Sequence, residues 1–243
     1  MNKRKSLLQG LPAALLILSA AISIYAQDQS GAKHNARPQQ SAAPAVVPDG
    51  SKDTGVKYTY EFSQPKFVVG HIVIEHDDNG RGTVTFQRLN EDTPVVEPLN
   101  LSLSALERIK SAWRALQFLD STTDYQADKQ FPHLGTMKIG MQQGERKRVA
   151  EFNWTNNTDA STLTNEYRKA ADQAILIFDI SIARENQPLN APKLMEAMES
   201  LLKRDALSDP KQLLKLLQEM STDEHIPLIA RNHALRLIKK IQK

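Results

Sequence analysis

Apolar and polar residues alternate most regularly between positions 69 and 88, on both sides of Asp78-Asn79-Gly80. This pattern is typical of two half-buried strands joined by a turn. A two-residue turn at Asn79 and Gly80 would mix apolar and polar side chains on each face of the hairpin. A three-residue loop at 78–80 instead gathers one apolar face, made of Ile72, Ile74, Val84 and Phe86. We therefore predict this register, with a type I turn that Gly80 closes in the left-handed region.

Two further stretches show the same alternation. Residues 56–62 predict a first strand, ended by Pro65, which lacks the N–H that a strand interior needs. Residues 136–141 and 146–154 predict a second hairpin, joined by a type II′ turn with Gly144 in its first position. Residues 94–98 are expected to form an irregular or short extended link. The apolar face of the first strand carries Val56, Tyr58, Tyr60 and Phe62. In the second hairpin, Ile139 is expected opposite Ala150, and the apolar face carries Met137, Ile139, Met141, Ala150, Phe152 and Trp154.

Helical spacing of apolar residues replaces the alternation in two segments of this region. Ser104 and Glu107 fit a capping box, and the residues after them predict a core-facing helix of three to four turns. A longer helix is predicted from Asp159 to Glu185 as the main cover of the sheet, before Gln187-Pro188 ends it. The two apolar stripes are Leu106, Ile109, Trp113 and Leu116, and Leu163, Tyr167, Ala170, Ala174, Phe178 and Ile182.

The C-terminal part is helical throughout in its pattern. We predict one helix after Pro192, a second after the Ser208-Asp209-Pro210 cap, and a third from Ile226 to Ile241, preceded by a capping box at Ser221 and Glu224. With Asp223 in a turn and Arg231 early in the last helix, residues 208–241 resemble one HEAT-type helical hairpin. Because a single repeat cannot stack into a solenoid, the resemblance implies a cap on the first domain or a surface for a partner.

These patterns predict an α+β fold. An antiparallel sheet of about five strands, formed by two hairpins and an N-terminal strand, would be covered by two helices and followed by a three-helix C-terminal appendage. The expected organisation is a signal peptide at 1–26, a disordered linker rich in Gln, Ala, Pro and Ser at 27–54, an α+β domain at 55–187 and a helical region at 188–243.

The first residues indicate a secreted or periplasmic protein. Three basic residues precede the apolar run from Leu11 to Ile24, which is short for a membrane span, and Ile24-Tyr25-Ala26 fits a cleavage site. An uncleaved anchor is the alternative, whereas cleavage would leave no membrane span. The chain contains no Cys, so a disulfide framework and a lipid-modified cysteine are excluded.

Net charge gives no sign of a nucleic-acid partner. The formal charge of +3 equals the number of basic residues in the signal segment, and the rest of the chain has 28 Lys and Arg against 28 Asp and Glu. This balance argues against a general polyanion binder. The expected partner is instead a protein or a component of the cell envelope.

Two groups of side chains are candidates for a functional site. His71, Glu75, Thr83 and Gln87 share the polar face of the first hairpin and could form a ligand surface on a rigid sheet, although an ordinary solvent face has the same pattern. The loop from Phe118 to His133 is long for a compact domain, which is often a mark of function. If it folds back on itself, four side chains could hold a divalent cation: Asp120, Asp124, Asp128 and His133.

The sequence carries no complete catalytic motif. It has no G-x-S-x-G, phosphate loop or dinucleotide fingerprint, and the lack of Cys excludes thiol catalysis. We therefore expect a non-enzymatic binding or protein-interaction module with no cofactor. Two alternatives stay open, a metal-assisted hydrolase that uses the loop at 120–133 and a structural protein of the cell envelope.

Overall fold

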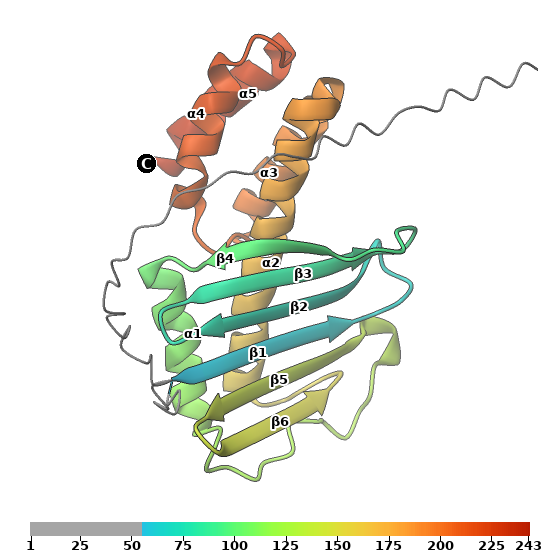
Figure 1. Ribbon diagram of the computed structural model, residues 1–243, viewed down its shortest axis with the longest axis vertical. Coiled ribbons are helices and arrows are strands. Elements are labelled where there is room, and N and C mark those ends of the chain that lie inside the picture. Colours follow the sequence, from blue (N-terminus) through green and yellow to red (C-terminus); the bar gives the residue numbers. More distant parts are fainter. Residues whose placement is uncertain (1–54) are drawn as a thin grey trace, which may run out of the picture. The chain divides into compact units, whose positions relative to one another are not determined.

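The computed structural model describes residues 55–243, and six antiparallel strands form its single sheet. The strands are β1 (Val56–Ser63), β2 (Val69–Asp77), β3 (Arg81–Arg88), β4 (Val95–Asn100), β5 (Thr136–Gln143) and β6 (Arg146–Phe152). Their spatial order is β4-β3-β2-β1-β5-β6, so β1 joins the two hairpins at the centre of the sheet (Figure 1). The predicted α+β class is confirmed, with six strands where about five were expected.

Both hairpins have the predicted registers. Ile74 lies opposite Val84 in the first hairpin, and Ile139 lies opposite Ala150 in the second. In the first turn, the backbone N–H of Gly80 donates to the Asp77 carbonyl at 3.1 Å, and Gly80 has a φ of +75°. Gly144 has a φ of +58°, as the first position of a type II′ turn requires. Turn chemistry and burial therefore agree on these registers.

The sixth strand is the segment that the sequence pattern presented as a link. Residues Val95–Asn100 pair with β3 and form one edge of the sheet, with Val96 opposite Thr85. Pro98 lies within this strand, although its nitrogen cannot donate to a ladder. On an edge strand this costs nothing where the nitrogen faces away from the neighbouring strand, which is where proline is tolerated.

Two helices cover one face of the sheet, α1 (Leu103–Leu116) and α2 (Thr158–Asn186), as predicted (Figure 1). The predicted N-cap of α1 is wrong by two residues, since the Ser102 hydroxyl, and not that of Ser104, accepts the Ala105 N–H at 3.2 Å. Asn157 caps α2 by accepting the Ala160 N–H at 2.8 Å. The first core lies between these helices and the sheet, and its largest side chains include Tyr60, Ile74, Phe86, Ile109, Trp113, Phe152 and Tyr167.

The C-terminal region packs as a second hydrophobic cluster. It contains three helices, α3 (Ala191–Lys203), α4 (Leu214–Thr222) and α5 (Leu228–Ile241), with short 3₁₀ turns at Pro188–Asn190 and Pro210–Leu213. The predicted capping box at Ser221 is wrong, because Ser221 lies inside α4 and α5 begins after Pro227. The resemblance to a HEAT-type hairpin stays a prediction.

Helix α2 belongs to both clusters. Its residues up to Ala171 are buried against the sheet, whereas Leu176 and Ile180 are buried among α3, α4 and α5. The predicted stripe is therefore wrong at its end, where Ile182 is 37% exposed and Ala183 is buried instead. Because α2 extends beyond the sheet to meet new neighbours, its buried side changes along its length.

The signal peptide predicted at 1–26 and the linker predicted at 27–54 lie outside the described residues. Within residues 55–243, no helix combines the length and the apolar character needed to cross a membrane.

Candidate functional site

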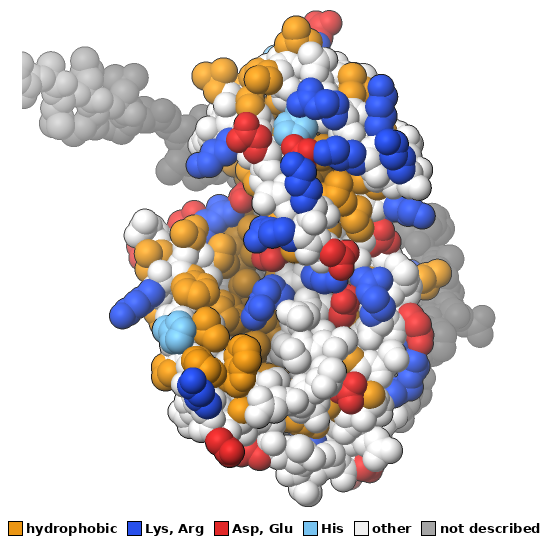
Figure 2. Space-filling model, turned by 180° about the vertical axis from the view of Figure 1, so that it is seen from behind, with side chains coloured by type: hydrophobic (Ala, Val, Ile, Leu, Met, Phe, Trp, Pro, Cys, Tyr) orange, Lys and Arg blue, Asp and Glu red, His pale blue; other side chains and the backbone are white. Residues whose placement is uncertain are grey.

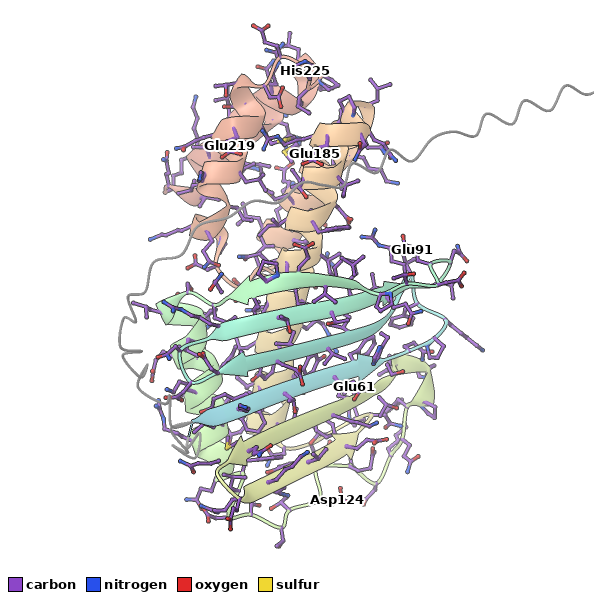
Figure 3. All side chains as sticks on the ribbon, in the orientation of Figure 1. Glu61, Glu91, Asp124, Glu185, Glu219 and His225 are labelled. Atoms are coloured by element: carbon purple, nitrogen blue, oxygen red, sulfur yellow. The ribbon has the colours of Figure 1, made fainter. Side chains whose placement is uncertain are left out.

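The four side chains predicted as a ligand surface lie on the face of the sheet opposite α1 and α2. His71 and Gln87 are cross-strand neighbours, and so are Glu75 and Thr83. The His71 imidazole lies 3.2 Å from a carboxylate oxygen of Glu61, which points away from the helices on β1 (Figure 3). The shared face is as predicted, but the four side chains form two pairs rather than one constellation.

One of these pairs borders a shallow depression of about 530 Å³ on the same face. Glu75 and Thr83 line it together with Lys57, Lys147 and the backbone of Gly82 and Gly140. Gly140 contributes to the depression by having no side chain, since a Cβ there would stand 2.3 Å from the Thr59 hydroxyl oxygen. At Gly82 a Cβ would stand 1.8 Å from the Glu75 carbonyl oxygen, so close strand packing explains this glycine without a ligand.

The acidic loop between α1 and β5 does not gather its candidate metal ligands. Asp120 forms an ion pair with Arg146, and Asp124 accepts the backbone N–H of Gln126 at 2.9 Å. The ring of His133 instead packs against Phe131, with centroids 6.0 Å apart. Asp124 lies on the loop beside the β6 edge of the sheet (Figure 3). Among residues 55–243, no three His, Asp or Glu side chains, Asp128 included, are placed to hold a metal ion.

The same loop is held to the sheet by a buried aromatic and an arginine. Tyr125 is 3% exposed and stacks on Phe118 with centroids 6.2 Å apart. The Arg148 guanidinium lies over both rings and donates to the carbonyls of Phe118 at 2.7 Å and Thr123 at 2.6 Å. The loop therefore completes the core beside β6, which accounts for its length.

A groove of about 1170 Å³ lies on the helix-covered side of the sheet. Its floor is formed by Phe62, Ile72 and Met137 on the apolar face of the sheet, each of them only 7–8% exposed. One wall is α2 and α3, and the other is the β1–β2 connection at 66–69 with the loops around Leu134 and Trp154. Figure 2 shows apolar side chains gathered around this hollow, with basic side chains beside it. We call this feature the groove.

Large apolar side chains at the rim of the groove are exposed to solvent. Val68 is 76% exposed, Phe67 44%, Trp154 43% and Leu134 38%. The prediction that Trp154 continues the apolar face of its strand is wrong, because β6 ends at Phe152. Apolar patches at the edge of a concave surface are typical of binding sites.

A polar strip runs along the α2 wall of the groove. Arg168, Asp172 and Asp179 line it from α2, and Arg204 lines it from the end of α3. Burial raises the pKa of the Asp172 carboxyl, while Arg168 and Arg204 oppose this effect. Burial likewise raises the pKa of the Tyr60 phenol to about 12, so this hydroxyl on the floor is neutral.

Two contacts hold the walls of the groove in place. The Gln64 amide, next to the β1–β2 connection, donates to the carbonyls of Pro132 at 3.1 Å and His133 at 3.0 Å. At the other side, Arg88 of β3 forms an ion pair with Asp179 of α2 and lies over the Phe178 ring. The groove is thus bounded by tied elements, which favours a preformed site.

A buried polar chain in the core links the sheet to both helices. The Tyr167 hydroxyl donates to His76 Nε2 at 2.8 Å and accepts the Trp113 indole N–H at 3.0 Å. His76 Nδ1 in turn donates to the Asp77 carbonyl at 2.7 Å, which leaves Nε2 as an acceptor. Burial lowers the pKa of His76. Because every member of the chain is paired inside the core, we assign it to folding and not to ligand chemistry.

Sequence patterns did not predict the groove. Its residues come from β1, β2, β5, α2, α3 and three connections between elements, which are far apart along the chain. The available signal was the apolar run Phe67-Val68-Val69, which begins in a short connection between strands, where residues are normally polar. Comparison with models of known families and with curated protein sequences finds no match to this chain.

Proposed function

We propose that this chain is a non-enzymatic binding module that acts outside the cytoplasm and takes an extended apolar ligand in the groove. One observation carries the proposal. A groove borders the apolar face of the sheet beside α2, and four large apolar side chains are exposed at its rim.

Size and lining support this function. Ligand sites in proteins are usually concave, mostly apolar and about 300–1,000 Å³ in volume, with a few polar groups that fix orientation. The groove slightly exceeds this range, and its charged groups lie mainly on the α2 wall, with Arg204 at the end of α3 and Lys66 on the rim. The signal segment predicted at the N-terminus supports a place outside the cytoplasm, where the partner would be a protein or an envelope component.

The metal-assisted alternative has less support. Its four candidate ligands are spread over a loop that is held by Tyr125 and Arg148. The self-assembling envelope protein has no specific support among the described contacts. The binding module is therefore the function that the described geometry favours.

Filling the groove tests the proposal. Ala197 is exposed on α3 and lines the groove, so Ala197→Trp would occupy it without disturbing the buried face of the helix. Ala115 is exposed on α1 and does not line the groove, so Ala115→Trp is the matched control. We expect the whole chain to bind an apolar fluorescent dye such as anilinonaphthalene sulfonate in its native state, and Ala197→Trp to reduce this binding severalfold.

Circular dichroism would establish that both variants keep the native fold. Equal dye binding by the two variants, or no dye binding by the native chain, would contradict the assignment of the groove as the apolar site.

A further inference from the structure

We infer that the ligand of the groove is a free single-chain amphiphile with an anionic head, whose chain lies on the sheet floor and whose head is held by Arg168 and Arg204. This inference rests on the proposed function and adds the chemical class of the ligand. It follows from the charges on the α2 wall and from their separation from the apolar floor.

The groove has more basic than acidic charge available to a ligand. Within residues 55–243, three cations that line it form no ion pair: Lys66, Arg168 and Arg204. Asp179 is already paired with Arg88, which leaves Asp172 as the one unpaired carboxylate of the lining. The unpaired lining charges therefore sum to a positive value, which complements an anionic group.

The two arginines approach the groove from different helices. Arg168 is on α2, and its guanidinium donates to the Met137 sulfur at 3.9 Å, so it reaches across the groove towards β5. Arg204 is the C-cap of α3, and the one hydrogen bond described for its guanidinium goes from Nε to the carbonyl of Ser200, at 3.3 Å. Both guanidinium groups keep donors free, and such groups bind carboxylates and phosphates through paired hydrogen bonds.

Polar and apolar parts of the groove are arranged as an amphiphile would need them. The floor formed by Phe62, Ile72 and Met137 is apolar, and the exposed rim beside it carries Phe67 and Val68. The charged groups are confined to α2, α3 and the single Lys66 of the rim. A hydrocarbon chain lying along the floor would bury the exposed apolar surface of Phe67 and Val68, and an ionic head would meet the arginines without entering the core.

Asp172 gives the inference a second, opposite test. Its carboxyl is half-buried between Arg168 and Arg204 and has no hydrogen bond or ion pair among the described residues. An anionic head would be repelled by this carboxylate, and a cationic head would be attracted. Removing the charge should therefore strengthen binding of an anion, while removing either arginine should weaken it.

Calorimetric titration of the whole chain with three ligands of equal chain length separates the possibilities. These are dodecanoate, dodecanol and dodecylammonium, each used below its micelle concentration. We expect dodecanoate to bind at least about tenfold more tightly than dodecanol. One hydrogen bond between charged groups is enough to change a dissociation constant by about this factor. Dodecylammonium should bind most weakly.

Four variants locate the head group. Arg168→Gln and Arg204→Gln should each weaken dodecanoate binding by about tenfold and leave dodecanol binding unchanged. Asp172→Asn should strengthen dodecanoate binding severalfold. Arg236→Gln is the control, because Arg236 is an exposed arginine of α5 that does not line the groove, and it should change nothing.

The outcomes distinguish this inference from the proposed function. If dodecanoate and dodecanol bind equally and independently of both arginines, the anionic head is refuted and the apolar groove stands. If neither ligand binds and Ala197→Trp leaves dye binding intact, both proposals fail. Flotation of the chain with vesicles that contain anionic phospholipid, without free dodecanoate, would assign the surface to a bilayer and overturn the free ligand.

Discussion

The buried hydroxyl of Tyr167 offers the most decisive test of how this core is held together. Tyr167→Phe keeps the ring and its packing but removes one oxygen. That oxygen donates to His76 Nε2 at 2.8 Å and accepts the Trp113 indole N–H at 3.0 Å. The ring of Tyr167 is fully buried, so water cannot replace either bond without opening the core.

The expected loss of stability follows from the two groups left behind. A buried donor or acceptor that loses its partner costs about 1–3 kcal/mol. With one acceptor on His76 and one donor on Trp113 left unpaired, the free energy of unfolding should fall by about 2–6 kcal/mol. Since domains of this kind are stable by about 5–15 kcal/mol, the variant should still fold.

Urea denaturation at a pH above 6.5 would measure this change. The slope of the unfolding free energy against urea concentration should stay the same, which would show that the folded and unfolded states keep their compactness. Tyr125→Phe is a matched control. Tyr125 is also buried, at 3% exposed, but its hydroxyl has no hydrogen-bond partner among the described residues. Removing that hydroxyl should leave stability unchanged or raise it slightly.

A loss below about 1 kcal/mol for Tyr167→Phe would refute the argument. Equal losses of stability for Tyr167→Phe and Tyr125→Phe would also refute it, because both remove one buried hydroxyl and only the hydroxyl of Tyr167 is hydrogen-bonded.

Three further predictions concern turns and titrating groups. Gly80→Ala should destabilise more than Gly144→Ala in thermal unfolding, because both have positive φ but only at Gly80 would the Cβ approach another residue, 3.0 Å from the Leu101 Cβ; equal effects would contradict this. Asp172→Asn should raise the melting temperature at neutral pH, because burial raises the pKa of this carboxyl and so penalises its charged form; the gain should vanish below pH 3.8, where both states are protonated, and a gain that persists there would be inconsistent. Burial lowers the pKa of His76 in the folded chain, so the stability that depends on neutral His76 should be complete above pH 6.5. It should decrease as the pH falls towards the pKa of the folded chain, because in that range only the unfolded chain binds the proton. A His76→Gln variant whose stability keeps the same dependence on pH would refute this prediction.

Much of the fold could be predicted from local sequence pattern. The register of the first hairpin followed from two local facts, the period-two burial of Ile72 and Ile74 and the left-handed conformation that Gly80 supplies. The capping position of α1 did not follow from local pattern, since Ser102 and Ser104 are chemically equivalent caps and only the final helix position decides between them.

The candidate site was beyond local pattern. Glu75 and Thr83 were correctly placed on one face, because strand alternation fixes the side on which a residue lies. That rule does not say which part of the other, apolar face a helix will cover. Asp120, Asp124, Asp128 and His133 illustrate the same limit, because their mutual distances depend on how Tyr125 anchors the loop.

The sequence by itself thus determined the strands, the hairpin turns, the helices and the polar or apolar character of each face. Only the tertiary structure decided that Val95–Asn100 pairs as an edge strand, that α2 changes its buried side, and that a groove borders the sheet beside it. The physical reason is the range of the interactions. Periodicity and turn preference act within a few residues, whereas edge pairing and the position of α2 and α3 over the sheet depend on contacts between distant segments.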